Sequence, residues 1–427
     1  MGLVLALMFL LMAFGIPIAY SIAVATAFGL SMFNVSYVII PQRMFTMLDS
    51  FTLMAVPFFV LAGTLMDRGG MSRRMIDFAK TLVGHVRGGL AMVVVLSCIL
   101  FGAISGSAAA VAAAIGMICI PAMVRDGYDK DFAAALTGVS APLGTIIPPS
   151  IAMVIYSGAS NASVGELFLA GYIPGIVMGS FIMLCAYLFS VNRGYPKGER
   201  ATFKETIRAF LDAIWALMLI VIIMGGILSG IFTPTEAASV SCFYAVLVGL
   251  FVYKDLKVKD IPIALAETAI TTAAVMFCVA TSNTLSWLMT SRNLPSIIAT
   301  MITTHLDSRI LILLAINFFY LIIGCFMDNA AGIILSVPIF LPLAVQLGID
   351  PVHFGIIVVC NLSLGSSTPP VGGSLFITSS ISKLPIMVVA KAMLPMWCFM
   401  LIGLLLITYI PELSMFLVNL RRAAALP

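Results

Sequence analysis

Long apolar stretches alternate with short polar segments along the whole chain, and about 20 consecutive apolar residues are enough for one transmembrane helix. This pattern predicts an all-α membrane protein that crosses the bilayer many times. The first stretch has no basic residue before Arg43, so we interpret it as a retained transmembrane helix and not as a cleavable signal. The predicted single helices are 3–32, 51–66, 132–158, 166–191, 209–231, 233–253, 263–290, 352–378 and 388–410.

Two further apolar stretches, 89–124 and 310–347, are too long for one helix and too short for two full crossings. Small or polar residues interrupt each of them near its middle, at 102–107 and at 324–329. Backbone can be irregular at membrane depth only where protein buries it or where it lines a wet cavity. We therefore expect two re-entrant hairpins, each of which enters and leaves the membrane on the same side.

The composition agrees with this pattern, because 62% of the 427 residues are hydrophobic and 9% are charged. Soluble domains are about half apolar and a quarter charged. The eight cysteines all lie in apolar stretches without a CxxC motif, and the three histidines have no partner at metal-ligand spacing. A disulfide framework, a transition-metal site and a haem site are therefore not expected. The net charge of +4 gives no indication of nucleic-acid binding.

The basic residues predict the orientation, because cytoplasmic loops carry most of the Lys and Arg. They gather in three clusters, at 68–87, 193–208 and 254–259. With the N-terminus in the cytoplasm and the spans given above, all three clusters lie inside and the C-terminus is periplasmic. The pattern favours a multi-pass protein of the bacterial inner membrane, surrounded by lipid.

The chain also repeats itself. The repeat predicts two halves, 1–208 and 232–427, joined by the helix 209–231. The first hairpin would open to the cytoplasm and the second to the periplasm, so the halves are inverted, which is typical of transporters. Amphipathic segments at 67–87 and 293–308 precede the hairpins, and we interpret them as in-plane helices that tether a mobile domain; ordinary loop helices are the alternative. The landmarks Pro121, Gly144, Pro148, Pro149 and Pro174 recur 221 positions later as Pro342, Gly365, Pro369, Pro370 and Pro395.

A Pro-Pro pair that follows a glycine by four residues predicts an unwound segment inside a membrane helix, since proline removes a donor and clashes with the preceding turn. Helix 132–158 has this pattern at Gly144–Pro149, and helix 352–378 has it at Gly365–Pro370. Unwinding frees carbonyl oxygens suited to Na⁺, and exposed helix N-termini attract anions. The alternative is two helices that are kinked only for packing.

Asp328 interrupts the second hairpin, and a carboxylate inside the membrane is costly and usually functional. We expect it to hold a cation or to orient the turn; a structural partner for nearby backbone is the alternative. Glu236 and Glu267 are weaker candidates, because both lie near the ends of spans and can reach water. Arg292 could meet a substrate carboxylate, with a snorkelling anchor as the alternative.

At four motifs the chain resembles the large membrane subunit of tripartite ATP-independent periplasmic (TRAP) transporters, and the resemblance covers nearly the whole length. It implies an elevator-type transporter that couples Na⁺ entry to uptake of a carboxylate. It also implies a soluble periplasmic binding protein that delivers the substrate and a small four-helix membrane subunit as partners. The motifs are Phe101–Ala108, Gly144–Ser150, Gly230–Ala237 and Gly365–Gly373.

The resemblance also implies where the ligands bind, with the substrate between the two hairpin turns. Among the substrates of the family it favours sialic acid over C4-dicarboxylates. For Na⁺ it implies Ser105, Ser107, Gly144, Thr145 and Pro148 in one site, and Asp328, Asn329, Gly365, Ser367 and Thr368 in the other. The residues expected to contact the substrate are Ser105, Gly106, Ser150, Asn329, Gly372 and Arg292.

Three other functions compete with this interpretation. An intramembrane serine hydrolase would use Ser105 as its nucleophile, but the chain has no histidine in the middle of a span to act as base. A channel would conduct without a binding protein and would not saturate at carrier rates. A self-sufficient carrier of the same superfamily would take up substrate without a periplasmic partner.

Overall fold

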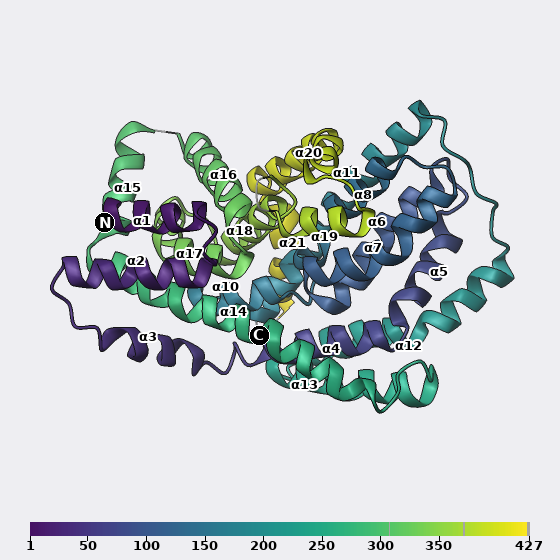
Figure 1. Cartoon of the computed structure of the whole chain (residues 1–427), viewed down its shortest axis with the longest axis horizontal. Helices are drawn as coiled ribbons and strands as arrows, with labels where there is room; N and C mark the ends of the chain where they lie inside the picture. Colours follow the sequence, from purple (N-terminus) through teal and green to yellow (C-terminus); the bar gives the residue numbers. More distant parts are fainter. Residues whose placement is uncertain (307, 370–371, 425–427) are drawn as a thin grey trace.

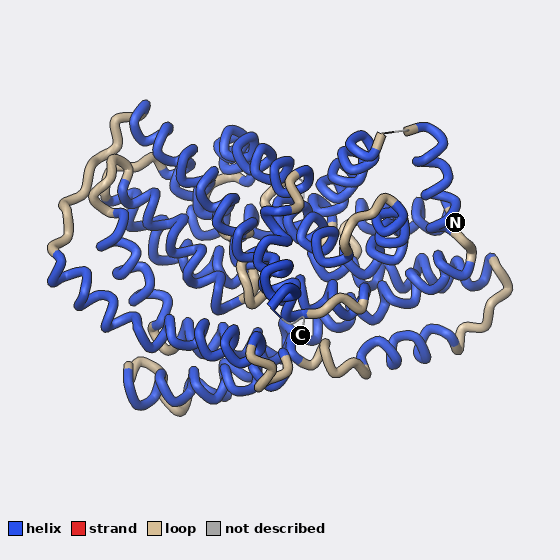
Figure 2. The backbone as a smooth tube through the Cα atoms, turned by 180° about the vertical axis from the view of Figure 1, so that it is seen from behind, coloured by secondary structure: helices blue, strands red, loops and turns tan. Residues whose placement is uncertain are grey.

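The computed structural model describes residues 1–306, 308–369 and 372–424, and this part of the chain is helical with no strand (Figures 1 and 2). Within these residues eight helices are long and apolar enough to cross a membrane, or nine if one bent pair counts as a single span. The predicted all-α, multi-pass fold is confirmed.

The N-terminal segment differs from the prediction. Helix α1 (Gly2–Ala13) and helix α2 (Ile18–Met32) are separate, and the side chain of Val4 lies against Gly29. The chain therefore folds back on itself, and the predicted single span 3–32 is wrong. Gly15 has a left-handed φ of 81° and Pro17 lacks an N–H, so neither continues a helix. The cytoplasmic N-terminus was predicted by counting 3–32 as one crossing, and the structure does not test it.

One group of helices forms a layer beside the hairpins, with α3, α4 and α13 along the lower edge of Figure 1. Helix α4 packs along α13, and the long α14 packs against α2, α3 and α4. Helix α3 was not predicted as an element. The bounds are α3 (Ile39–Leu48), α4 (Ala55–Arg68), α12 (Phe203–Leu228), α13 (Pro234–Leu247), a π-helical turn (Val248–Val252) and α14 (Asp260–Ser291).

Two amphipathic helices precede the hairpins, as predicted. Helix α5 (Met71–Val83) buries Met71 and Met75 and packs on α6 (Gly89–Ser105) and α12. Helix α15 (Leu294–His305) lies against α17 (Asn329–Gln346) and has no fully buried residue. Their role as tethers of a mobile domain stays a prediction.

Both interrupted stretches turn at the small or polar residues where the sequence predicts an interruption. In the first, α6 (Gly89–Ser105) and α7 (Ala108–Arg125) flank a turn that we call the first tip, residues 105–107. In the second, α16 (Arg309–Phe326) and α17 (Asn329–Gln346) flank the second tip, residues 327–329. Their depth in a bilayer, and hence their re-entrant character, stays a prediction.

The first Pro-Pro helix is interrupted, as predicted, and its two parts meet at an angle of 45°. We call residues 141–150 the first break, and the described residues 366–369 and 372 the second break. Pro370, which belongs to the second predicted Pro-Pro pair, lies outside the described residues. The helices are α8 (Lys130–Ser140), α9 (Leu143–Ile146) and α10 (Ile151–Ser160) for the first, and α18 (Pro351–Gly365) and α19 (Gly373–Ser382) for the second.

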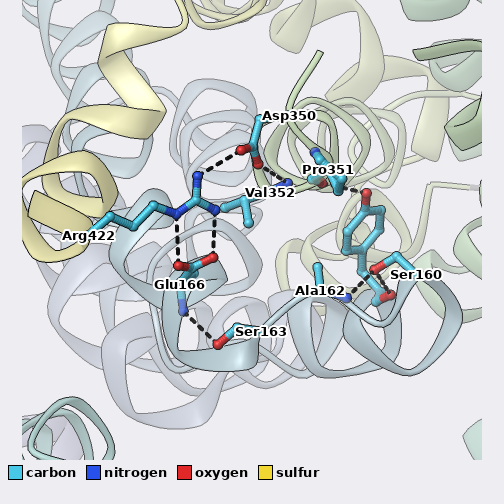
Figure 3. Close-up of polar contacts among 9 residues, drawn as sticks. Ser160, Ala162, Ser163, Glu166, Asp350, Pro351, Val352 and Arg422 are labelled. Atoms are coloured by element: carbon cyan, nitrogen blue, oxygen red, sulfur yellow. Dashed lines mark hydrogen bonds and ion pairs between the residues drawn. The ribbon is translucent and has the colours of Figure 1, made fainter. Parts of the chain in front are cut away.

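The C-terminal helix α21 (Glu412–Ala424), which was not predicted, is held by an ion cluster (Figure 3). Arg422 donates to both carboxylate oxygens of Glu166, at the start of α11 (Val164–Asn192), and to Asp350, which caps α18. The hydrogen bonds with Glu166, and to a smaller extent the one with Asp350, raise the pKa of the Arg422 guanidinium. The cluster thereby joins segments of the two predicted halves. Helix α20 (Ile386–Tyr409) precedes α21.

Candidate functional site

A cavity of about 490 Å³ lies where the two tips and the two breaks meet. Helices α4 and α14 form its other wall. Among the predicted site residues, the cavity is lined by Ser105, Gly106, Ser107, Thr145, Asp328 and Asn329.

Two pairs of glycines bring each tip onto its break. A Cβ atom added to Gly102 on α6 would lie 2.6 Å from the Cα of Gly144 on α9. A Cβ atom added to Gly324 on α16 would lie 2.9 Å from the Cα of Gly365 on α18. No side chain fits into either contact, and small residues allow this close approach of helix backbones in membranes. The glycines therefore place both tips against the breaks.

The first tip offers hydroxyl and backbone oxygens. Gly106 has a left-handed φ of 63°, and its carbonyl accepts the N–H of Ile151 at the start of α10 (3.3 Å). Ser107 caps α7 by accepting the N–H of Ala110 (3.5 Å). The hydroxyl of Ser105 is buried and has no hydrogen-bond partner among the described residues. An unsatisfied buried hydroxyl is costly, so this oxygen is available to a ligand.

The second tip offers a carboxylate and an amide. Asp328 caps α17 by accepting the N–H of Ala330 (3.2 Å), and its side chain is exposed to the cavity. Asn329 is buried, and its amide nitrogen donates to the hydroxyl of Ser363 (3.4 Å). The carbonyl oxygen of the Asn329 side chain has no partner in the described part of the chain. Both groups are oxygen ligands of the kind that hard cations prefer.

Several predicted residues support the breaks and lie outside the described lining of the cavity. Ser150 donates to the carbonyl of Thr145 (2.5 Å) and caps α10. The hydroxyls of Ser367 and Thr368 both donate to the carbonyl of Leu364, at 2.7 and 3.0 Å. The remaining members of this group are Gly144, Pro148, Gly365 and Gly372, and direct contact of any of the group with Na⁺ or substrate stays a prediction.

Arg292 lies at the end of α14, away from the described lining of the cavity. Its guanidinium stacks 4.3 Å from the ring centroid of Phe33 and donates to the Phe33 carbonyl (3.3 Å). This position fits an anchor near the membrane surface. Contact of Arg292 with a substrate is not tested by this position and stays a prediction.

The sequence analysis missed Ser363 and Asp67, and it ranked Glu267 only as a weaker candidate. Ser363, on α18, lies within hydrogen-bond distance of both Thr145 (2.6 Å) and Asn329 (3.4 Å). Asp67 and Glu267 line the end of the cavity formed by α4 and α14, and Arg68 pairs with Glu267 at 2.6 Å. The sequence carries a signal for Ser363, because Asn361 and Ser363 are polar residues in the middle of an otherwise apolar helix.

Comparisons with known proteins agree on one family. The model of "Tripartite ATP-independent periplasmic transporter, DctM component" matches residues 5–413. The C4-dicarboxylate TRAP transporter large permease protein of Pseudomonas aeruginosa is 43% identical, over 88% of each chain. The sialic acid TRAP transporter large permease protein of Vibrio cholerae is 39% identical, over 95% of each chain.

Two further comparisons concern a longer relative and a solved structure. The isethionate TRAP transporter permease protein of Oleidesulfovibrio alaskensis is 41% identical, over 95% of this chain and 64% of that protein. The crystal structure of the Alcanivorax borkumensis YdaH transporter matches with a TM-score of 0.64 and 12% identity, covering 86% of each chain. At that identity the structural match concerns the fold.

Proposed function

The chain belongs to the DctM component family of tripartite ATP-independent periplasmic transporters, and we propose that it couples Na⁺ entry to the uptake of an organic acid. The family consists of multi-pass transporter permeases of the inner membrane and not of enzymes. Its large permeases work with a small membrane subunit and a periplasmic binding protein.

One observation carries the proposal of Na⁺ coupling. The cavity collects two buried side-chain oxygens that have no partner among the described residues, on Ser105 and Asn329, together with the carboxylate of Asp328. A Na⁺ ion would supply the positive charge that these oxygens are placed to receive. Because the oxygens come from different tips, we assign one cation to each tip. Bound cations would also offset the cost of bringing an anion into a low-dielectric site.

The substrate class rests on charge and on relatives. Relatives are named for C4-dicarboxylates, sialic acid and isethionate, which are all anions. A cavity of about 490 Å³ has room for a sugar acid as well as for a dicarboxylate, so its volume does not select between them. We keep sialic acid, which the resemblance favoured, as the first substrate to test.

We propose an elevator-type movement between two inverted halves. The tips and breaks contact one another closely, while α4 and α14 touch the cavity from the other side. The cavity extends to Asp67 and Glu267, next to the basic cluster that begins at Arg68. Because such clusters favour the cytoplasm, we assign this conformation to the inward-facing state, with a periplasmic C-terminus.

Uptake into proteoliposomes tests the proposal. The vesicles contain this chain with its small membrane partner, and radiolabelled sialic acid, succinate or isethionate is presented with the periplasmic binding protein. We expect uptake of one acid that requires an inward Na⁺ gradient and does not occur with K⁺. Equal uptake in Na⁺ and K⁺ would overturn the coupling. Uptake without the binding protein would point to a self-sufficient carrier.

A further inference from the structure

Three buried side chains form a hydrogen-bonded chain from the second tip to the first break. The Asn329 amide nitrogen donates to the hydroxyl of Ser363 (3.4 Å), which lies 2.6 Å from the hydroxyl of Thr145. Thr145 in turn donates to the carbonyl of Pro142 (2.8 Å). The exposed fractions of Asn329 and Thr145 are 8% and 6%, and Ser363 is fully buried.

The available donors and acceptors allow only one direction of donation along this chain of hydrogen bonds. A hydroxyl has a single hydrogen, and Thr145 uses its hydrogen for the carbonyl of Pro142. Ser363 must therefore donate its hydrogen to Thr145, and one of its lone pairs accepts the N–H of Asn329. Rotating the Asn329 side-chain amide by 180° would place its carbonyl oxygen against the hydroxyl oxygen of Ser363, and both would be acceptors. Only a rotation of the Ser363 and Thr145 hydroxyls as well would avoid this. The chain thus fixes which end of the amide is free.

The free end is the carbonyl oxygen, which is buried, lacks a described partner and belongs to a residue that lines the cavity. We infer that Ser363 is a positioning residue that holds this oxygen ready for the cation at the second tip and couples that cation to the first break. The inference rests on the proposed Na⁺ coupling. In this inference Ser363 acts through Asn329 and Thr145, without direct contact with Na⁺ or with the substrate.

The coupling follows from polarisation along the chain. A cation on the Asn329 carbonyl oxygen makes the amide N–H a stronger donor, which strengthens each following bond. The last of these bonds orders Thr145 next to Gly144, which packs against α6 just before the first tip. Binding of one Na⁺ then favours binding of the other, and the effect is reciprocal. The expected signature is a steep dependence on Na⁺ concentration.

The test is a Na⁺ titration of the purified full-length chain in lipid nanodiscs, read by tryptophan fluorescence. Trp397 is a natural reporter because its indole N–H donates to Ser367 in the second break (3.1 Å). The variant is Ser363→Ala. The matched control is Ser140→Ala, since Ser140 is equally buried and its hydroxyl bonds the carbonyl of Leu136 in its own helix.

We expect Ser363→Ala to raise the half-saturating Na⁺ concentration about fivefold to tenfold, the effect of one orienting hydrogen bond. The titration should also lose its steepness, while Ser140→Ala matches the wild type. A purely structural role for Ser363 would lower the unfolding temperature without changing the steepness. Identical titrations of Ser363→Ala and Ser140→Ala would overturn the inference.

Thr145→Val provides a second, independent variant in case Ser363→Ala does not fold. It keeps the bond between Ser363 and Asn329 and removes the next link. We expect lost steepness with a rise of only about twofold to threefold in half-saturation, and the double variant should behave like Ser363→Ala alone. If the effects of the two substitutions on half-saturation were additive, the proposed chain of hydrogen bonds would be contradicted. A wild-type protein that responds equally to Na⁺ and K⁺ would overturn the Na⁺ coupling itself, and with it this inference.

Discussion

The two tips have the same glycine contacts with the broken helices and differ in chemistry. At both, a glycine on the first hairpin helix presses against a glycine of the broken helix, Gly102 on Gly144 and Gly324 on Gly365. At both, a side chain caps the second hairpin helix. The first cap is the neutral Ser107, whereas the second is the carboxylate of Asp328.

The breaks differ as well. Helix α10 starts with a side-chain cap from Ser150, and the tip carbonyl of Gly106 is bonded to Ile151. Helix α19 begins at Gly373, and its N-cap Gly372 has no side chain to cap it. The first tip therefore offers neutral oxygens, and the second tip offers a formal charge. We therefore expect the charge of the second tip to dominate the affinity for a cation, while the first tip contributes mainly geometry.

The largest expected effect comes from removing that charge. Asn caps helices about as well as Asp, so Asp328→Asn keeps the fold of the second tip and removes only the negative charge. Loss of a charged ligand corresponds to about 3 kcal/mol, or roughly 100-fold in Na⁺ affinity and uptake. Radiolabelled uptake at several Na⁺ concentrations measures it. Unchanged Na⁺ dependence in this variant would show that no cation binds at the second tip.

Alanine substitutions at Gly144 and Gly365, one glycine in each broken helix, compare how tightly the two hairpins pack against the broken helices. A Cβ atom at Gly144 meets the side chain of Val111, which can move, whereas one at Gly365 meets the backbone of Gly324. We expect Gly365→Ala to destabilise the protein by about 1–3 kcal/mol and Gly144→Ala by less. Thermal unfolding in detergent, followed by circular dichroism, checks the order. Equal losses would mean that the second tip can move away from its break.

Two serines separate ligand binding from stability at the first tip. Ser105→Ala removes a hydroxyl without a described partner, so the free energy of unfolding should stay the same or rise, while Na⁺ affinity falls about fivefold to tenfold. Ser107→Ala removes a helix cap and should cost about 1 kcal/mol of stability. Thermal unfolding with and without Na⁺ separates the two effects. An unchanged amount of bound Na⁺ in the double variant would show that no cation binds at the first tip.

The smallest effect is expected at the ion cluster that joins segments of the two halves. Arg422 is 42% exposed in its pairs with Glu166 and Asp350 (Figure 3), and exposed ion pairs contribute about 1 kcal/mol or less. Arg422→Ala should lower the unfolding temperature slightly and leave the half-saturating Na⁺ concentration unchanged. Arg422→Lys is the matched control for charge without the bidentate geometry. A large change in Na⁺ affinity would show that the cluster, and not only the tips, controls the sites.

The sequence predicted the tips and the first break because glycine, proline and polar residues inside apolar stretches act locally. It failed for the N-terminal span, where Gly15 and Pro17 were included in a long apolar run although they end one helix and begin another. Ser363 was missed because its partner Thr145 is 218 residues away, and only packing brings them together. The hydroxyls of Ser367 and Thr368 donate to the preceding turn of their own segment, which composition alone does not show. Their contact with a cation stays a prediction.

The most direct test is equilibrium binding of radioactive Na⁺ to the purified chain in lipid nanodiscs. The two-site account predicts saturable binding, with about half of the bound Na⁺ lost in Asp328→Asn and about half lost in Ser105→Ala combined with Ser107→Ala. A wild-type protein without saturable Na⁺ binding would contradict the account. Full binding in both variants would contradict the assignment of one cation to each tip.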